Sequence, residues 1–342
     1  MTRWINDPLV DDGIIISSRI RLARNAAKYP FQITLADTMA EAMMAEVADA
    51  LFDAPNPLAK EADFFKLSDL SESERRVMFE QQIISHTLYK SERAAGIVKR
   101  QDGSVSVLLN EEDHIRIQSV AAGARIHGAW ERANLVDDAI EARMAYAFDK
   151  EFGYLTTCPT NTGTGLRASF MVHLPMLDKT EQLKNIVPAL GKFGMTVRGF
   201  YGEGTEPFGS VFQISNQLTL GKSEPEIIKA LQNITKQVTD NEARLLAKAL
   251  EKDKTAVEDN VYRSYGILAN ARTISSKEAL GLLSNIRLGF MTGILNAPKP
   301  TQTVISLMMN CQPGTMEARR GAAQAAVRDR YRAEYLRKAL QN

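Results

Sequence analysis

Two arginines stand two positions apart in a segment that is predicted to be a strand. An apolar run from Gly13 leads into Ser17-Ser18-Arg19-Ile20-Arg21. Alternate residues of a strand project from the same face, so Arg19 and Arg21 would lie side by side and repel each other. A bound polyanion relieves this repulsion, because guanidinium groups bind phosphate oxygens through paired hydrogen bonds. The segment indicates a phosphate site, and a solvated basic edge strand would explain it equally well.

Consecutive acids interrupt a second pair of predicted strands. Asn110-Glu111-Glu112-Asp113-His114 separates Ser104–Leu109 from Ile115–Ile117. A carboxylate in this place could orient a nucleophile or accept its proton, and Arg116 could contact phosphate. A charged turn between two strands is the alternative interpretation.

Two further segments are rich in glycine. Cys158–Ala168 contains Gly163-Thr164-Gly165, which would let the backbone approach a ligand closely, with Arg167 at the ligand's edge. Arg198–Gly204 is predicted to be a loop that closes over a ligand. A flexible surface loop and a hairpin turn are the respective alternatives. Cys158 is either an exposed thiol beside the site or a small loop residue.

Composition restricts the class of protein. With 342 residues, 44% hydrophobic and 24% charged, the chain is typical of soluble globular proteins. A net charge of +1 argues against general attraction to nucleic acid or membrane. Its two cysteines and four histidines show no metal-ligand spacing, and no signal or membrane segment is evident. We therefore expect a cytoplasmic protein without a protein-built metal site.

The secondary structure predicted around these segments changes along the chain, from mixed strands and helices to helices alone. Leu35–Phe52 is predicted to be a helix and Val211–Ser215 a strand. Capping boxes at Ser223–Glu226 and Ser275–Glu278 predict helix starts, and a last long helix is expected from Thr315 to Leu340, with Ala326, Val327, Tyr331 and Tyr335 as apolar positions. The pattern predicts an α+β catalytic domain over residues 1–245 and a helical domain over residues 246–342.

Taken in order, the four segments resemble the phosphagen (guanidino) kinase family over roughly residues 14–221. The resemblance implies an antiparallel sheet flanked by helices and ATP held by arginines, with Mg²⁺ bound mostly by phosphate oxygens and water. The arginines that match the family's phosphate-binding set are Arg19, Arg21, Arg116, Arg167 and Arg198. His86 matches a histidine at the nucleotide base. Glu112 matches the catalytic carboxylate, and Glu203 matches a second catalytic acid.

The resemblance extends to the residues around these positions. The implied nucleotide-binding segments are Ser17, Ser18, Arg19, Ile20 and Arg21; His86; Arg116; Arg167, Ala168, Ser169, Phe170 and Met171; and Arg198, Gly199, Phe200, Tyr201, Gly202 and Glu203.

Within the family the chain is most similar to the bacterial protein arginine kinases. Small-molecule members carry a helical domain before the Ser-Ser-Arg strand, whereas here that strand begins at Ser17 and a helical part follows the kinase part. Arg328-Asp329-Arg330-Tyr331-Arg332-Ala333 resembles a regulatory motif in which Arg328, Asp329 and Arg332 would bind phosphoarginine. A solvated arginine-rich helix is the alternative.

The resemblance also implies partners. These are a heat-shock repressor and unfolded proteins as substrates, a zinc-finger activator protein, a Clp-type protease that degrades the marked proteins, and a second copy of the chain in a homodimer. A small-molecule guanidino kinase and an inactive phosphoarginine-binding adaptor remain the competing hypotheses.

Overall fold

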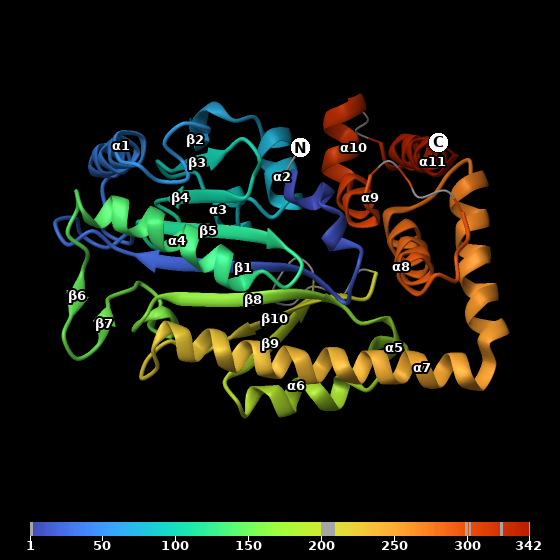
Figure 1. Cartoon of the computed structure of the whole chain (residues 1–342). Coiled ribbons are helices and arrows are strands. Elements are labelled where there is room, and N and C mark those ends of the chain that lie inside the picture. Colours follow the sequence, from blue (N-terminus) through green and yellow to red (C-terminus); the bar gives the residue numbers. More distant parts are fainter. Residues whose placement is uncertain (1–2, 200–208, 298–299, 301, 322–323, 342) are drawn as a thin grey trace. The chain divides into compact units, whose positions relative to one another are not determined.

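The computed structural model describes residues 3–199, 209–297, 300, 302–321 and 324–341. Eight strands are hydrogen-bonded in the order β2-β3-β4-β5-β1-β8-β10-β9 (Figure 1). Strands β2 to β5 pair antiparallel with their neighbours, and the predicted antiparallel sheet flanked by helices is confirmed. The strands of this sheet are β1 (Ile15–Arg24), β2 (Ala62–Lys66), β3 (Gly96–Arg100), β4 (Val105–Leu109), β5 (Ile115–Ala122), β8 (Leu166–His173), β9 (Met195–Gly199) and β10 (Val211–Asn216). A separate hairpin joins β6 (Phe148–Asp149) to β7 (Gly153–Tyr154).

The chain forms two compact units, and it passes between them several times. The first unit comprises the residues up to 4, 18–169 and 215–232, and the second comprises 5–17, 170–214 and 233–342. Helices of the first unit are α1 (Asp37–Asp53), α2 (Glu72–Glu80), α3 (His86–Lys90) and α4 (Ile126–Glu141). Those of the second are α5 (Pro175–Lys179), α6 (Leu183–Gly191), α8 (Ser276–Thr292), α9 (Val304–Asn310), α10 (Pro313–Arg320) and α11 (Ala325–Gln341). Helix α7 (Glu224–Asn270) has residues in both units.

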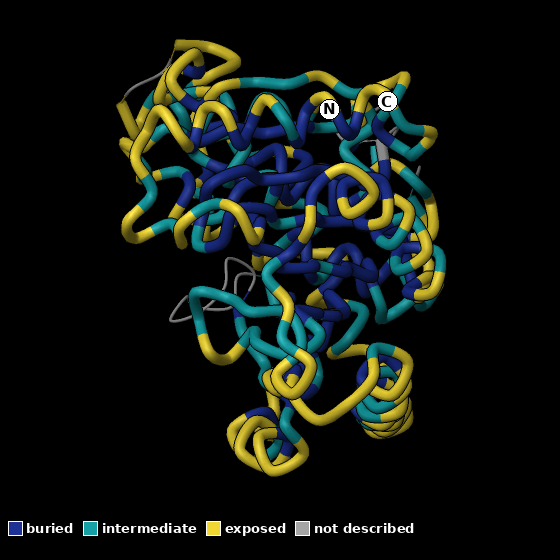
Figure 2. The backbone as a smooth tube through the Cα atoms, turned by 90° about the vertical axis from the view of Figure 1, so that its left-hand side faces the viewer, coloured by how far each residue is buried: buried dark blue, intermediate teal, exposed yellow. Residues whose placement is uncertain are grey.

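Apolar strand residues build the core of the first unit. All five residues of β4 are buried, and Val107 and Leu109 pair with Ile117 and Ile115 of β5. Helix α4 packs on β5 through a buried face that includes Ala129, Ala133 and Val136. Figure 2 shows the strands mostly buried, whereas the outer turns of the helices are exposed. Because both ends of the β4–β5 pair are held by this core, the connecting residues 110–114 are held as well.

One of the two bonds of each predicted capping box is present among the described residues at the two helix starts. The backbone N–H of Ser223 donates to Glu226 Oε2 at 2.8 Å where α7 begins. The backbone N–H of Glu278 donates to the Ser275 hydroxyl at 3.2 Å where α8 begins. These bonds satisfy backbone groups that a helix terminus leaves without an intrahelical partner.

The prediction of one last helix from Thr315 to Leu340 is wrong, because two helices, α10 and α11, occupy these residues. Helix α10 ends at Gly321, whose φ of 65° lies in the left-handed region that terminates helices. The predicted apolar positions are also partly wrong, since Ala326 is exposed. The buried face of α11 instead contains Arg332, Ala333, Leu336, Ala339 and Leu340.

Helix α7 bends at one residue. Asp253 has φ −158° and ψ 79°, and its carboxylate accepts the Ala256 N–H at 2.9 Å, as the first residue of a new helical segment would. The domain boundary predicted at residue 245 falls inside α7 before this bend, and it stays a prediction. Among the described residues, no helix is both long enough and apolar enough to cross a membrane.

Candidate active site

Four predicted arginines of the first unit act on one another electrostatically. Arg19 and Arg21 come from β1, Arg116 from β5 and Arg167 from β8. Burial, followed by the charge of Arg116, lowers the pKa of Arg19 to about 10. Burial and then Arg116, Arg19 and Arg167 lower the pKa of Arg21 well below its ordinary value. The strands therefore bring like charges together at a cost in free energy of folding.

Arg21 differs from its neighbours Arg19 and Arg116 in its hydrogen bonds. Arg19 Nη2 donates to Gln82 Oε1, and Arg116 Nη1 donates to the carboxylate of Glu111. Arg21 Nε is buried and has no hydrogen-bond partner among the described residues. A buried polar atom without a partner is costly unless a ligand supplies one. The cluster fits a polyanion such as the phosphates of ATP.

The loop that joins β4 to β5 is closed tightly on itself. The Asn110 N–H donates to the His114 carbonyl at 2.8 Å, and Asn110 has a φ of 58°. Asparagine tolerates this left-handed conformation better than most residues. The loop consequently presents its acids from a fixed backbone.

Asp113 and His114 of this loop form hydrogen bonds with other residues of the protein. Asp113 Oδ1 accepts from Asn25 Nδ2 and from the Thr157 N–H, both at 2.7 Å. His114 Nδ1 accepts the Ala26 N–H at 3.1 Å, so its Nε2 carries the proton that it donates to the Pro30 carbonyl at 2.9 Å. Burial lowers the pKa of His114, which keeps the ring neutral.

The two glutamates of the loop differ in environment. Glu111 is buried, and although burial opposes its charge, Arg116, the Ser85 hydroxyl and Arg21 hold its pKa below the ordinary value. Glu112 is partly exposed, and its carboxylate makes no hydrogen bond or ion pair with the described residues. Burial and the neighbouring Asp113 raise the pKa of Glu112, against the opposing charge of Arg116. Glu112 is therefore the acid of this loop that is left for chemistry.

Residues 82–86 bring the predicted base-binding histidine next to the cluster. Gln82 accepts from Arg19, and the Ser85 hydroxyl is bonded to Glu111 and also accepts the Leu88 N–H at 3.0 Å. His86 begins α3, where its ring lies 5.7 Å from that of Phe79. Sequence reasoning missed Gln82 and Ser85. Of the two, only Ser85 could have been found from the sequence, because serine is a preferred N-cap residue and Ser85 directly precedes α3.

The two glycines of the Cys158–Ala168 loop contact protein backbone. A Cβ at Gly163 would lie 2.6 Å from the Thr219 carbonyl oxygen, and one at Gly165 would lie 2.5 Å from that of Ala23. The absence of side chains at these two positions therefore lets the loop pack directly against β1 and the segment before α7. The close approach of this loop to a ligand stays a prediction. Cys158 is half-buried, and its Sγ lies 3.0 Å from the Thr160 hydroxyl.

Replacing Gly165 with Ala is expected to destabilise the first unit strongly. Its φ of 62° strains any L side chain by about 1–2 kcal/mol, and the clash with Ala23 and Arg24 adds about 1–3 kcal/mol. Gly221→Ala is the matched control, because Gly221 has a φ of 76° with nothing within 4 Å. Urea unfolding followed by circular dichroism measures both. Equal losses in the two variants would contradict the packing role of Gly165.

The other predicted site residues fall into three groups. The side chains of Ser17, Ser18, Ile20, Ala168, Ser169, Phe170 and Met171 are buried within their strands. Arg198 and Gly199 lie on β9 in the second unit. Phe200, Tyr201, Gly202 and Glu203 lie outside the described residues.

The predicted phosphoarginine motif anchors the start of α11. Arg332 is 1% exposed and donates to the carbonyls of Cys311 at 2.7 Å and Ile274 at 2.8 Å, and it is paired with Asp329. Arg328 is partly exposed, with its Nη1 4.0 Å from Glu317. The alternative of a solvated helix is therefore wrong for Arg332.

Family models match nearly the whole chain. Residues 42–245 match the ATP:guanido phosphotransferase C-terminal catalytic domain, and residues 254–342 match the protein-arginine kinase McsB C-terminal domain. Among solved structures, a lombricine kinase aligns with a TM-score of 0.60 and 26% identity over 68% of this chain and 67% of that one. A duplicated taurocyamine kinase from Schistosoma mansoni shares the fold, with a TM-score of 0.60 over 75% of this chain and 39% of that one.

Relatives of known name extend over the full length. The protein-arginine kinase of Bacillus subtilis is 40% identical over 99% of this chain and 93% of its own. That of Brevibacillus brevis is 39% identical over 99% of this chain and 95% of its own. The resemblance read from the motifs is confirmed. The chain belongs to the protein-arginine kinases, within the ATP:guanido phosphotransferase family.

Proposed function

We propose that this protein transfers the γ-phosphate of ATP to arginine side chains of proteins. One observation carries the proposal: the carboxylate of Glu112 stands in the electrostatic field of Arg116 and Arg167, in a cluster where Arg21 Nε is buried without a hydrogen-bond partner among the described residues. Phosphoryl transfer requires positioning and charge neutralisation more than covalent chemistry. This arrangement supplies a place for phosphates beside a base.

Glu112 would act on the nucleophile. Free guanidinium has a pKa above about 12, so it is protonated and not nucleophilic at neutral pH. The Glu112 carboxylate would hold the substrate guanidinium in line and accept its proton. As that proton leaves, a bond forms between nitrogen and the γ-phosphorus, and the bond from phosphorus to the bridging oxygen breaks to release ADP. Glu203 is proposed as a second acid from the family resemblance alone.

Arg19, Arg21, Arg116 and Arg167 would neutralise the phosphates, with Arg198 added from the family resemblance. His86 would contact the base. The described residues contain no group of three or more His, Cys, Asp or Glu side chains that could hold a metal ion. Mg²⁺ would therefore be bound mostly by phosphate oxygens and water, where it neutralises phosphate charge.

The function is tested with ATP, Mg²⁺ and an unfolded casein-like protein. Mass spectrometry under conditions that preserve the P–N bond should find phosphate on arginine side chains of the protein. Modification of free arginine or creatine alone would favour a small-molecule guanidino kinase. Binding of phosphoarginine without any transfer would favour an inactive adaptor.

Replacing Arg21 with Met is expected to stabilise the protein while weakening ATP binding about tenfold or more. Burial and three neighbouring cations oppose the charge of Arg21, and Met keeps the apolar stem. Thermal unfolding with and without ATP measures both effects, since a bound ligand raises the midpoint by an amount that grows with the logarithm of its affinity. Arg143→Met is the control, because Arg143 is exposed and pairs with Asp53 at 3.8 Å. An Arg21→Met variant that is less stable and still binds ATP normally would contradict this role.

The raised pKa of Glu112 predicts where activity is lost in acid. A base acts only when deprotonated, so activity should be complete above this pKa and fall as the pH drops through it. The acid limb of log kcat/KM is expected above pH 4.5, the ordinary value. ADP release is the suitable measurement, because acid hydrolyses the product. With circular dichroism showing an intact fold, a limb at or below pH 4.5 would argue against Glu112.

Regulation and partners are proposed from the resemblance. Arg328, Asp329 and Arg332 would bind phosphoarginine, with Arg328 as the accessible cation. The proposed substrates are a heat-shock repressor and unfolded proteins in the cytoplasm, marked for a Clp-type protease. The other proposed partners are a zinc-finger activator protein and a second copy of the chain in a homodimer. Free phosphoarginine should alter the rate of the wild type and leave Arg328→Met unaffected; an equal response in both would exclude this site.

A further inference from the structure

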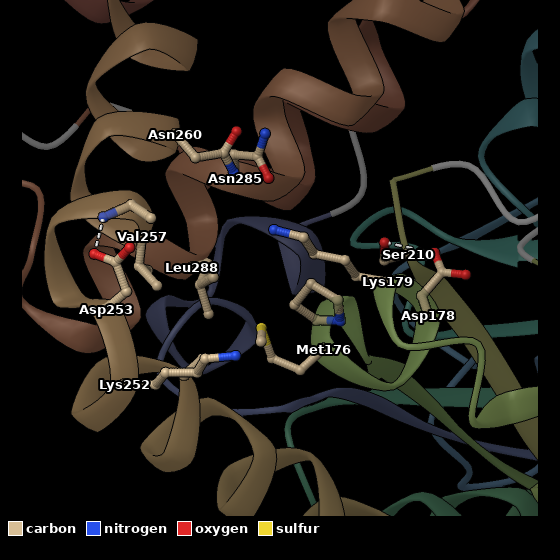
Figure 3. Close-up of a pocket in the computed structure, with 13 residues that line it drawn as sticks. Met176, Asp178, Lys179, Ser210, Lys252, Asp253, Val257, Asn260, Asn285 and Leu288 are labelled. Atoms are coloured by element: carbon tan, nitrogen blue, oxygen red, sulfur yellow. Dashed lines mark hydrogen bonds between the residues drawn. The ribbon is translucent and has the colours of Figure 1, made fainter.

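A cavity in the second unit is lined by residues that include none of the described site residues named above (Figure 3). It has a volume of about 580 Å³, is open to solvent on one side, and is lined by residues of α5, the bend of α7 and α8, together with Ser210. Sites for small molecules usually have volumes of about 300–1,000 Å³ and combine apolar walls with a few polar groups. Met176, Val257 and Leu288 supply apolar surface here.

Two lysines extend into this cavity. Figure 3 shows the ammonium groups of Lys179, from α5, and Lys252, from α7, reaching into the space from two sides. Neither lysine forms an ion pair within the described part of the chain, although two acids line the same cavity. Asp178 Oδ2 accepts the Ser210 hydroxyl at 2.7 Å, and Asp253 Oδ1 accepts the Ala256 N–H at 2.9 Å. Both acids point away from the space between the lysines (Figure 3).

Amides complete the lining. Asn260 and Asn285 are both among the lining residues. Asn285 Nδ2 donates to the Ser264 hydroxyl oxygen at 3.0 Å, and the side chain of Asn260 makes no hydrogen bond with the described residues. Lys179 and Lys252 are both exposed, so a neutral apolar ligand would gain nothing from their charges, whereas an anion would be attracted to them. An anion with an apolar body satisfies both the lysines and the apolar walls.

We propose that this cavity binds a small amphiphilic organic anion, a compound with an apolar body and one carboxylate, sulfonate or phosphate group. Its acidic group lies between Lys179 and Lys252, where charge-assisted hydrogen bonds form. Its body lies on Met176, Val257 and Leu288. This site is separate from the proposed phosphotransfer site. Evidence against one of the two proposals would therefore not count against the other.

Binding would connect the two parts of α7. Lys252 precedes the bend at Asp253, whereas Val257 and Asn260 follow it. The wall formed by α5 is already attached to the earlier part of α7, because the Glu242 carboxylate accepts the N–H groups of Met176 at 2.7 Å and Leu177 at 2.8 Å. A ligand that also contacts the later part would hold the bend in one geometry.

The test is a fluorescence titration of the full chain with 8-anilinonaphthalene-1-sulfonate. N-phenyl-1-naphthylamine, which has the same apolar body without the sulfonate, is the matched neutral probe. We expect one saturable site per chain for the anion, and about tenfold weaker binding in Lys179→Met and in Lys252→Met. Lys254→Met is the control variant with the same loss of charge. Lys254 stands two residues from Lys252, pairs with Glu258 at 3.1 Å and does not line the cavity.

Three results would overturn the proposal. They are the absence of saturable binding, equal binding of the two probes, and equal affinity in Lys252→Met and Lys254→Met. Hydrogen exchange supplies a second measurement, because the anion should slow exchange across residues 252–260 in the wild type. Val257→Phe, which fills the cavity, should abolish that protection with the circular dichroism spectrum unchanged. Protection that persists in Val257→Phe would place the probe elsewhere.

Discussion

Replacing Glu112 with Gln is expected to lower the rate of phosphoryl transfer by about 10²–10⁴-fold, the usual contribution of a general base. The amide keeps the shape of the side chain but cannot accept the proton of the substrate guanidinium. ATP binding should be retained, because the carboxylate of Glu112 makes no hydrogen bond or ion pair with the described arginines. Initial rates on an unfolded protein substrate and ATP affinity by calorimetry measure the two effects separately.

The neighbouring acid is the matched control for this variant. Glu111→Gln removes the partner of Arg116 from a buried position, where the Glu111 side chain is 1% exposed. This change should lower both stability and ATP affinity, because the partly exposed guanidinium of Arg116 loses its buried counter-charge. Glu112→Gln should lower neither. Unchanged turnover in Glu112→Gln would remove Glu112 from the reaction, and loss of ATP binding there would make it a nucleotide-positioning residue.

Replacing Arg24 with Met is expected to cost about 3–5 kcal/mol of stability, as is usual when one partner of a buried ion pair is removed. Arg24 is 1% exposed, and its Nη2 lies 2.7 Å from Asp137 Oδ2. Arg24 Nη2 also lies 3.9 Å from Glu224 Oε1, so two carboxylates lose their cation. Its Nη1 donates to the Thr164 carbonyl at 2.9 Å, and the guanidinium lies 3.6 Å from the centre of the Tyr154 ring. Methionine fills the space, yet it leaves Asp137 charged and buried without a cation.

An ion pair of the same length on the surface is the control. Arg100 Nη2 lies 2.6 Å from Glu61 Oε2, but the Glu61 side chain is 61% exposed. Arg100→Met should therefore cost less than about 1 kcal/mol. The double variant Arg24→Met/Asp137→Leu should recover part of the loss, because the buried charge of Asp137 is removed with its partner, while Glu224 still lacks Arg24. Recovery should be incomplete, since the carbonyls of Ala23 and Thr164 also lose their donor. Urea unfolding curves that coincide for Arg24→Met and Arg100→Met would contradict the argument.

Arg24 also illustrates a limit of sequence reasoning. It stands only three residues after Arg21, and no local signal separates the two. The fold gives Arg24 a carboxylate, carbonyls and an aromatic ring, whereas it leaves Arg21 with a buried Nε that has no partner. Whether an arginine is structural or available to a ligand depends on residues distant in the chain. Asp137 and Tyr154, which decide it here, lie more than a hundred residues away.

The same holds for the acids and for the regulatory motif. Glu111 and Glu112 are adjacent and chemically identical, and only the positions of Arg116 and Ser85 make one of them a buried partner. Arg328 and Arg332 are predicted to share a helix face, but packing of α11 buries Arg332 against two carbonyls. Periodicity indicates which residues are neighbours on a helix and does not indicate which of them face the core.

The sequence by itself determined the family, the antiparallel sheet flanked by helices, and the segments that contain the site, because long motifs and strand alternation are local properties of the chain. The tertiary structure alone decided which side chains of those segments stay uncommitted, that Gly163 and Gly165 seat a loop on the chain itself, and that Gly321 divides the last helix. It also revealed the cavity at the bend of α7, whose lysines come from helices more than seventy residues apart. Burial and pairing are properties of contacts between distant segments, so they emerge only when the chain is folded.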